Sequence, residues 1–271
     1  MLDLIQITND PSLARRCDAL EGMRLFVDLE RLGKAERQAG RNTFISTHAL
    51  DDVGRVKSQL QRARLMVRVN PLHADSRAEV DAVIAQGADL IMLPMFEDAA
   101  TLRAFSALVA GRRGIVPLLE TAGALDSLPD WIGTPGLWEV YMGLNDLHLS
   151  LGLRFMFEPL AQGLVDRVAD AARARGLRFG FGGIARLDEG LLPGRRVLGE
   201  HLRLGSGAVI LSRTFHRPDS EAVFEQEVEA LRRVERELAT RSPDRIARDA
   251  ADTAEAIRRI AASMPATTPA N

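Results

Sequence analysis

Short apolar runs alternate with amphipathic segments along most of the chain. Each apolar run has the length of a buried strand, and the segments between them repeat apolar residues at helical spacing. The runs expected as strands are 2–8, 23–30, 65–70, 88–94, 114–119, 137–143, 178–183 and 207–213. Strands that alternate with helices in this way favour an α/β fold, the TIM-type (β/α)8 barrel. An open doubly wound sheet would need a glycine-rich turn after the first strand, where this chain has Thr8-Asn-Asp-Pro11.

Capping signals place several of the helices. Asp10-Pro11 supplies an N-cap and a first-turn proline for a helix that ends at about Gly22. Ser76-Arg-Ala-Glu79 has the form of a capping box for another, with Gly87 at its end. Further helices are expected at 51–62, 98–110, 164–175, 192–204 and 220–240, whereas Asp146 is expected in a loop.

A last helix is expected beyond Ser242-Pro243. Its mostly apolar stripe consists of Ile246, Ala250, Thr253, Ile257 and Ile260. Such a stripe either binds a partner surface or packs back on the chain's own barrel, and the pattern alone does not separate the two. The predicted organisation is a barrel domain at 1–240, an extra C-terminal helix at 241–263 and a flexible tail at 264–271.

Composition limits the classes of function. The chain has 271 residues with 46% hydrophobic content, enough for one sizeable core, and a formal charge of −2. We expect no nucleic-acid partner from this balance, and no membrane association because no apolar run approaches spanning length. The single cysteine, Cys17, excludes an intrachain disulfide and fits a reducing cytoplasm.

Two acids end successive strands. Glu120 and Asp146 each follow an apolar run, and a helix-length segment separates them, so parallel strands would bring both carboxylates to one rim. Hard oxygen ligands of this kind suit Mg²⁺ or Mn²⁺, which keep further positions for water or substrate. The simpler alternative makes Glu120 a helix N-terminal acid and Asp146 a capping residue; the pair together favours the metal site.

Arg68 lies inside an otherwise apolar strand, 65–70. A buried guanidinium must be paired or hydrogen-bonded. One interpretation is a structural ion pair with an acid such as Glu30 or Asp28, and the other is an anion clamp for a substrate. The sequence leaves both open.

An ordered set of motifs resembles the HpcH/HpaI aldolase and citrate lyase family, metal-dependent carbon–carbon lyases built on such a barrel. The matching pieces are Val27-Asp-Leu-Glu30, Val67-Arg-Val-Asn-Pro71, Gly87-Ala-Asp-Leu-Ile-Met-Leu-Pro94, Leu119-Glu-Thr-Ala122 and Gly143-Leu-Asn-Asp-Leu-His-Leu-Ser-Leu-Gly152. Each is weak alone, but their order and spacing make the resemblance specific.

The resemblance implies roles for several residues. Glu120 and Asp146 would bind the divalent cation, and Arg68 would contact the substrate oxygen at the bond being broken. The backbone N–H groups from Leu144 through Asn145 to Asp146 would hold the carboxylate of a 2-oxo acid. Enolate charge that develops on cleavage would be stabilised by the cation and Arg68. The resemblance also implies a homo-oligomer joined by C-terminal helices, which a monomer in light scattering at high concentration would contradict.

The general base is where the chain departs from the family pattern. The aldolase members have a histidine directly after the acidic pair of strand two, where this chain has Arg31. The candidate catalytic residues are therefore Arg68, Glu30, His48 and His148, although a lone histidine is more often a structural hydrogen-bonding residue. His73, His201 and His216 are expected to be structural.

Glycines and basic residues follow the last two strands. Phe179-Gly-Phe-Gly-Gly-Ile-Ala-Arg186 and Ser212-Arg213 fall where such barrels often bind phosphate, which makes Gly183 and Arg186 candidates for binding a distal phosphate or carboxylate. The alternative is that the glycines only permit a tight exit from the strand.

The chain has only two lysines, Lys34 and Lys57, and neither falls on a predicted strand. Schiff-base chemistry is therefore disfavoured relative to metal-assisted enolisation. The expected function is a metal-dependent lyase acting on a 2-oxo acid and an aldehyde. One alternative is a lyase of acyl-CoA thioesters, with the CoA ester as substrate and not as a bound cofactor, towards which Asp28-Leu29-Glu30 leans. The other is a barrel that binds metal and ligand but has lost turnover.

Overall fold

The eight predicted strands are all present and form a closed barrel. The computed structural model describes residues 1–33, 47–215 and 223–265. The strands are β1 (Asp3–Ile7), β2 (Met23–Asp28), β3 (Arg64–Arg68), β4 (Leu90–Leu93), β5 (Gly114–Leu119), β6 (Glu139–Met142), β7 (Arg178–Ile184) and β8 (Ala208–Leu211). They are ordered β1-β2-β3-β4-β5-β6-β7-β8 in the barrel, which confirms the predicted (β/α)8 architecture. The chain forms two compact units, Ile5–Tyr141 and Met1–Leu4 with Met142–Asn271.

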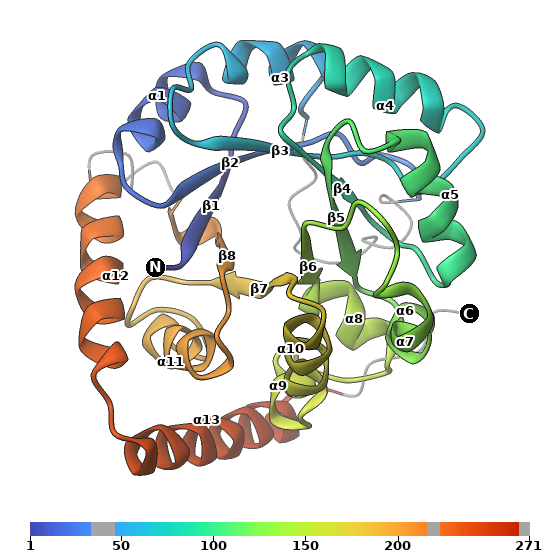
Figure 1. Ribbon diagram of the computed structural model, residues 1–271. Coiled ribbons are helices and arrows are strands. Elements are labelled where there is room, and N and C mark those ends of the chain that lie inside the picture. The colour runs from blue at the N-terminus through green and yellow to red at the C-terminus, as the bar shows by residue number, and fades with distance from the viewer. Residues whose placement is uncertain (34–46, 216–222, 266–271) are drawn as a thin grey trace. The chain divides into compact units, whose positions relative to one another are not determined.

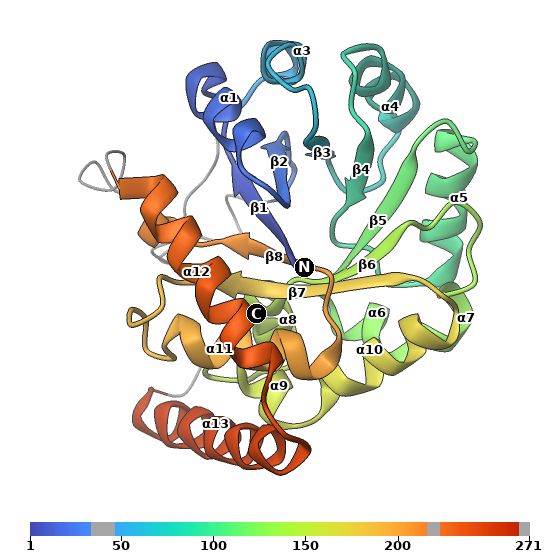
Figure 2. The same cartoon turned by 60° about the vertical axis from the view of Figure 1, so that its left-hand side comes forward.

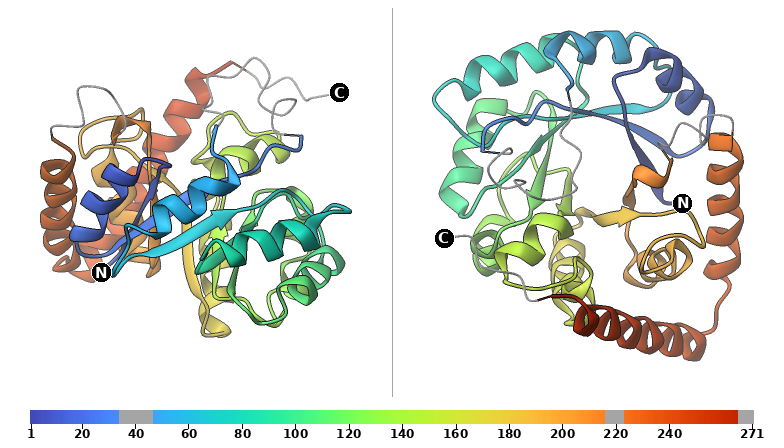
Figure 3. Two further views of the ribbon diagram at one scale, coloured as in Figure 1. Left: turned by 90° about the horizontal axis from the view of Figure 1, so that it is seen from above. Right: turned by 180° about the vertical axis from the view of Figure 1, so that it is seen from behind.

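In the unit Ile5–Tyr141, parallel strands lie under a layer of helices. The helices are α1 (Pro11–Ala19), α3 (Leu50–Lys57), α4 (Ser76–Ala85), α5 (Ala99–Val109), α6 (Ala122–Asp126) and α7 (Leu128–Trp131). Figures 1 and 3 show α3, α4 and α5 following one another along the outer side of β3 to β5. Covered strands have no polar face, which explains why their sequences are continuously apolar.

A buried ion pair joins β2 to β6 within this unit. Arg24 and Glu139 are almost completely buried, and the two guanidinium nitrogens lie 2.6 and 3.0 Å from the carboxylate oxygens. The guanidinium also stacks over Trp138, 4.8 Å from the ring centroid. Arg24 is the second residue of β2 and Glu139 is the first of β6, so the pair lies at the N-terminal ends of the strands, the end of a barrel that serves stability rather than catalysis.

The unit Met1–Leu4 with Met142–Asn271 holds the C-terminal helices. They are α8 (Leu144–Ser150), α9 (Glu158–Ala161), α10 (Leu164–Ala174), α11 (Gly194–Leu204), the 3-10 helix η1 (Arg213–Phe215), α12 (Phe224–Ala239) and α13 (Pro243–Ser263). Figures 1 and 2 show α13 running past α9 and α11, and it contacts both. Thr253, Ile257 and Ala261 are buried there, so part of the predicted stripe packs on the chain itself. The homo-oligomer stays a prediction.

Two local predictions were wrong. Asp146 lies in the first turn of α8, not in a loop. The N-cap of α4 is Asp75, and Ser76 and Glu79 form no capping box: the Ser76 hydroxyl accepts from the His73 amide, and Glu79 binds Asn70. Lys34, His216 and the tail residues 266–271 lie outside the described residues. Within the part of the chain that the structure describes, no helix is long and apolar enough to span a membrane.

His201 gives this unit a specific dependence on pH. Its ring stacks on Phe181 at 3.9 Å, Nδ1 lies 2.8 Å from the Ser206 hydroxyl, and burial lowers the pKa of His201 to about 3. The folded pKa lies below the unfolded value of about 6.5, so the unfolded chain takes up the proton first as the pH falls. Stability from the neutral ring is complete above pH 6.5 and is lost towards pH 3.

We expect the free energy of unfolding to fall by about 2 kcal/mol between pH 6.5 and pH 5 through this residue. Urea unfolding at the two pH values measures it, and His201→Gln should remove that part of the pH dependence. An unchanged pH dependence in His201→Gln would assign the effect to other groups.

Candidate active site

Arg68 forms a two-pronged ion pair at the ends of β2 and β3. The strand register places Asp28 directly beside Arg68. Arg68 Nε and one terminal nitrogen each donate to a different Asp28 oxygen at 2.8 Å. Forked pairs of this kind fix the guanidinium plane as well as its position. The predicted structural ion pair of Arg68 is therefore confirmed, with Asp28 as the main partner.

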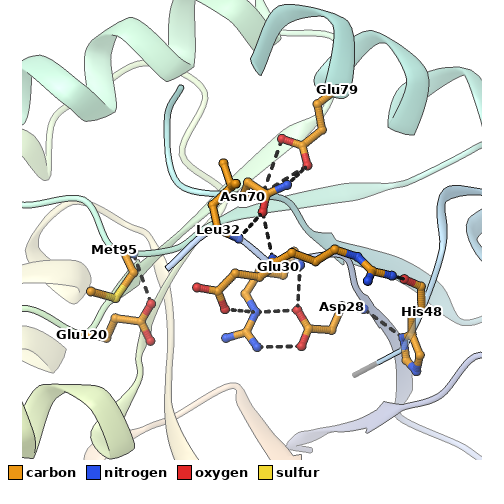
Figure 4. A network of polar contacts seen from close by, with 10 residues as sticks. Asp28, Glu30, Leu32, His48, Asn70, Glu79, Met95 and Glu120 are labelled. Atoms are coloured by element: carbon orange, nitrogen blue, oxygen red, sulfur yellow. Dashed lines mark hydrogen bonds and ion pairs between the residues drawn. The ribbon is translucent and has the colours of Figure 1, made fainter. Parts of the chain in front are cut away.

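Glu30 is a second carboxylate partner of the same guanidinium, and Figure 4 shows Glu30 beside Asp28. Glu30 Oε2 lies 3.3 Å from Arg68 Nε, and the Glu30 amide donates to Asp28 at 3.2 Å. Burial by itself lowers the pKa of Arg68, but Asp28, Glu30 and Glu120 outweigh that effect and raise it above its ordinary value. Arg68 therefore stays charged, and the three carboxylates with one guanidinium carry a formal charge of −2.

Glu120 follows β5 and is oriented by a strained backbone. Met95 has φ 54°, a left-handed conformation that is uncommon for a residue other than glycine. Its amide donates to Glu120 Oε1 at 3.1 Å (Figure 4). Thr121, not Glu120, is the N-cap of α6, and no acid lies in the first turn of that helix. Glu120 therefore lies directly before the N-cap and outside the first turn, and its role as metal ligand or as helix N-terminal acid stays a prediction. Backbone strain of this kind gathers at functional sites.

His48 contacts the backbone of Asp28. Its Nδ1 accepts from the Asp28 amide at 3.1 Å, so the ring hydrogen is on Nε2. The Arg31 guanidinium, which stands where the aldolase branch has a histidine, donates to the His48 carbonyl at 2.8 Å. His48 is thus brought to the cluster of Asp28, Glu30, Arg68 and Glu120, with one ring nitrogen engaged by the backbone.

The remaining candidates lie in the other unit. Asp146 is half-buried in the first turn of α8, Leu144 is buried and Asn145 is exposed. His148 Nδ1 lies 3.1 Å from the Leu144 carbonyl, one helical turn earlier, which is an ordinary structural contact. The roles of these residues stay predictions.

Gly183 and Arg186 are placed by β7 and the segment after it. A side chain at Gly183 would meet the Ile210 carbonyl at 3.5 Å, an ordinary contact distance. One Arg186 nitrogen lies 3.6 Å from Glu189 and 3.9 Å from Glu227. Arg186 therefore faces carboxylates, and anion binding by Gly183 and Arg186 stays a prediction.

The donor set suits a hard divalent cation. Within residues 1–33, 47–215 and 223–265, no group of three His, Cys, Asp or Glu side chains is arranged to hold a metal. Magnesium is commonly held by only one or two carboxylates, with water and substrate as its other ligands. Glu120, held in place by the Met95 amide, is one carboxylate of this kind. Its chemistry fits such an ion, and Asp146 as the second ligand stays a prediction.

Comparison with known proteins gives a family match and partial relatives. The model of the HpcH/HpaI aldolase/citrate lyase family matches residues 7–181. A (3S)-malyl-CoA thioesterase of Cereibacter sphaeroides (strain KD131) is 35% identical over 130 residues, 46% of this chain and 45% of that protein. The chain thus matches less than half the length of this relative.

Solved structures share the fold at low identity. An HpcH/HpaI aldolase/citrate lyase family protein from Burkholderia cenocepacia has a TM-score of 0.61 and 17% identity, covering 86% of this chain and 95% of that one. The citrate lyase beta subunit from M. tuberculosis, complexed with oxaloacetate and magnesium, has a TM-score of 0.56 and 19% identity, covering 83% and 96%. Identities this low bear on the fold alone.

Proposed function

Because the chain belongs to the HpcH/HpaI aldolase/citrate lyase family, we propose that it is a divalent-cation-dependent lyase of a carbon–carbon bond next to a carbonyl group. The observation that carries the proposal is the buried cluster at the ends of β2 and β3, in which Asp28 and Glu30 both contact Arg68. Glu120 and Asp146 would hold Mg²⁺ or Mn²⁺. When bound, the cation supplies positive charge that stabilises negative charge on a carbonyl oxygen.

The chain's own contribution is a preorganised positive charge. Asp28 fixes the plane of the Arg68 guanidinium, and Glu30 contacts its Nε. A group held in this way does not need to reorient when the substrate oxygen becomes negative, which is the main source of electrostatic catalysis. Arg68 would donate to that oxygen. Glu30 is our candidate base because its carboxylate lies beside Arg68, whereas His48 and His148 each use Nδ1 for a backbone contact.

Two substrate classes compete. An acyl-CoA thioester is favoured by the malyl-CoA thioesterase relatives at 35% identity and by Asp28-Leu29-Glu30 at the end of β2. A 2-oxo acid adduct is favoured by the oxaloacetate bound to the citrate lyase beta subunit of similar fold. We propose the thioester as the first candidate, with a 2-oxo acid and aldehyde as the second. A barrel without turnover is the third possibility.

Proton exchange with solvent deuterium separates the three. Lyases of both kinds must remove a proton from the methyl group of one product, either an acetyl thioester or pyruvate. We expect Mg²⁺ or Mn²⁺ to stimulate deuterium uptake by acetyl-CoA, measured by mass spectrometry. Uptake by pyruvate alone would indicate the 2-oxo acid class. Uptake by neither compound with any divalent ion would contradict the proposed enzyme and indicate a binding protein.

A further inference from the structure

The Asn70 side chain ties the segment after β2 to the segment after β3. Its Oδ1 accepts two hydrogen bonds, from the Arg31 amide at 2.8 Å and from the Leu32 amide at 2.9 Å (Figure 4). A carbonyl oxygen has two lone pairs, so this single atom is fully used. Asn70 thus holds the backbone just beyond Glu30.

A brace from α4 fixes the orientation of the Asn70 amide. Asn70 Nδ2 donates to Glu79 Oε1 at 2.7 Å, and the Asn70 backbone amide lies 3.2 and 3.3 Å from the two Glu79 oxygens. His73 Nδ1 accepts from the Asp75 amide, so its Nε2 carries the hydrogen and donates to Glu79 Oε2 at 3.2 Å. Glu79 therefore accepts hydrogen bonds from both Asn70 and His73. Because Asn70 Nδ2 points at Glu79, Asn70 Oδ1 must face the segment after β2.

We call the hydrogen bonds from the Arg31 and Leu32 amides to Asn70, with Glu79 behind it, the Asn70 clamp. The clamp affects Arg68 through the position of Glu30. On the near side of Glu30, the Leu29 amide donates to the Arg68 carbonyl at 2.9 Å. On the far side, Asn70 accepts hydrogen bonds from the Arg31 and Leu32 amides. The Glu30 carboxylate lies 3.3 Å from Arg68 Nε, a contact that small backbone movements would break.

We propose that Asn70, braced by Glu79, is a positioning residue that holds Glu30 against Arg68. Its effect on turnover rests on the proposed function, whereas its effect on the backbone and on Arg68 does not. Arg68 is only 15% exposed, and loss of the Glu30 contact removes one of its carboxylate partners, so that Asp28 alone holds the guanidinium within this pair of strands.

Exchanging the amide of Asn70 and the carboxylate of Glu79 between the two positions tests the clamp. Asn70→Asp keeps an acceptor oxygen for the two amides but sets a second carboxylate against Glu79, so we expect the clamp to open. Adding Glu79→Gln restores it, because the introduced amide donates to the introduced carboxylate while its oxygen still accepts from His73 and the residue-70 backbone. Asp81→Asn, at a half-exposed acid of the same helix, is the matched control.

Two readouts report the clamp without requiring activity. Amide hydrogen exchange of the peptide covering 29–32 should rise about tenfold in Asn70→Asp, as expected from the loss of roughly 1.4 kcal/mol of hydrogen bonding. Phenylglyoxal labelling of Arg68, followed by peptide mass spectrometry, should rise severalfold. Both should return to near wild type in Asn70→Asp/Glu79→Gln and stay unchanged in Asp81→Asn.

Wild-type exchange and labelling in Asn70→Asp would overturn the inference, as would a double variant that behaves like the single one. Absence of deuterium uptake by the wild type would remove the proposed function, while the labelling would still decide the clamp. If the wild type is active, we expect Asn70→Asp to lower kcat more than it changes KM, and the double variant to recover it.

Discussion

Replacing Arg68 by lysine should lower kcat about 10²–10³-fold, the usual effect of removing one preorganised electrostatic contact. Lysine keeps the positive charge but lacks the planar fork that binds both Asp28 oxygens at 2.8 Å while contacting Glu30 at 3.3 Å. The lysine ammonium could contact Asp28 or Glu30 but would not be fixed between them. The charge would then no longer be held where the carbonyl oxygen becomes negative.

The measurement is kcat and KM for the substrate that shows deuterium uptake, with thermal unfolding to confirm that the variant folds. Arg64→Lys is the matched control because Arg64 begins the same strand and stacks over Trp138, 5.1 Å from the ring centroid. It should keep kcat within about twofold, as expected for a surface residue outside the site. Wild-type kcat in Arg68→Lys would show that the guanidinium is only structural.

Glu120→Gln should abolish metal-dependent turnover at ordinary cation concentrations. The substitution preserves shape and can keep the contact with the Met95 amide, but it removes the negative charge that a hard cation requires. Loss of the cation forfeits several kcal/mol of charge stabilisation, or about 10²–10³-fold or more in rate. Glu97→Gln is the control, since Glu97 is an exposed acid in the loop between β4 and α5. Retained metal-stimulated activity in Glu120→Gln would remove Glu120 from the metal site.

The strands could be predicted from the sequence because buried parallel strands have no polar face. Apolar runs therefore marked most strands of the barrel, alternation of apolar and polar residues marked β1, and the ends of β2, β3 and β5 carried the polar residues of the site. Pairing Arg68 with an acid also followed from the cost of burying a charge. The sequence alone could not identify Asp28 rather than Glu30 as the main partner, because this depends on the register of β2 against β3, which places Asp28 beside Arg68.

The contacts that orient the site could not be predicted. Met95 gives no sign in the sequence of its left-handed backbone, because that conformation favours glycine. Glu79 matched a local capping pattern, yet it binds Asn70, nine residues earlier and beyond the start of the helix. In both cases a tertiary contact overrode the local preference. Helix α8, Leu144–Ser150, was expected as the loop that carries Asp146.

The central claim is that Glu120 and Asp146 together bind one divalent cation. Isothermal titration of the protein with Mn²⁺ tests it most directly, using the wild type, Glu120→Gln, Asp146→Asn and the control Glu97→Gln. We expect one site in the wild type and the control, and affinity weaker by about 10²-fold or more in each of the other variants, as expected for loss of a carboxylate ligand. No uptake by the wild type, or equal affinity in all four proteins, would contradict the account.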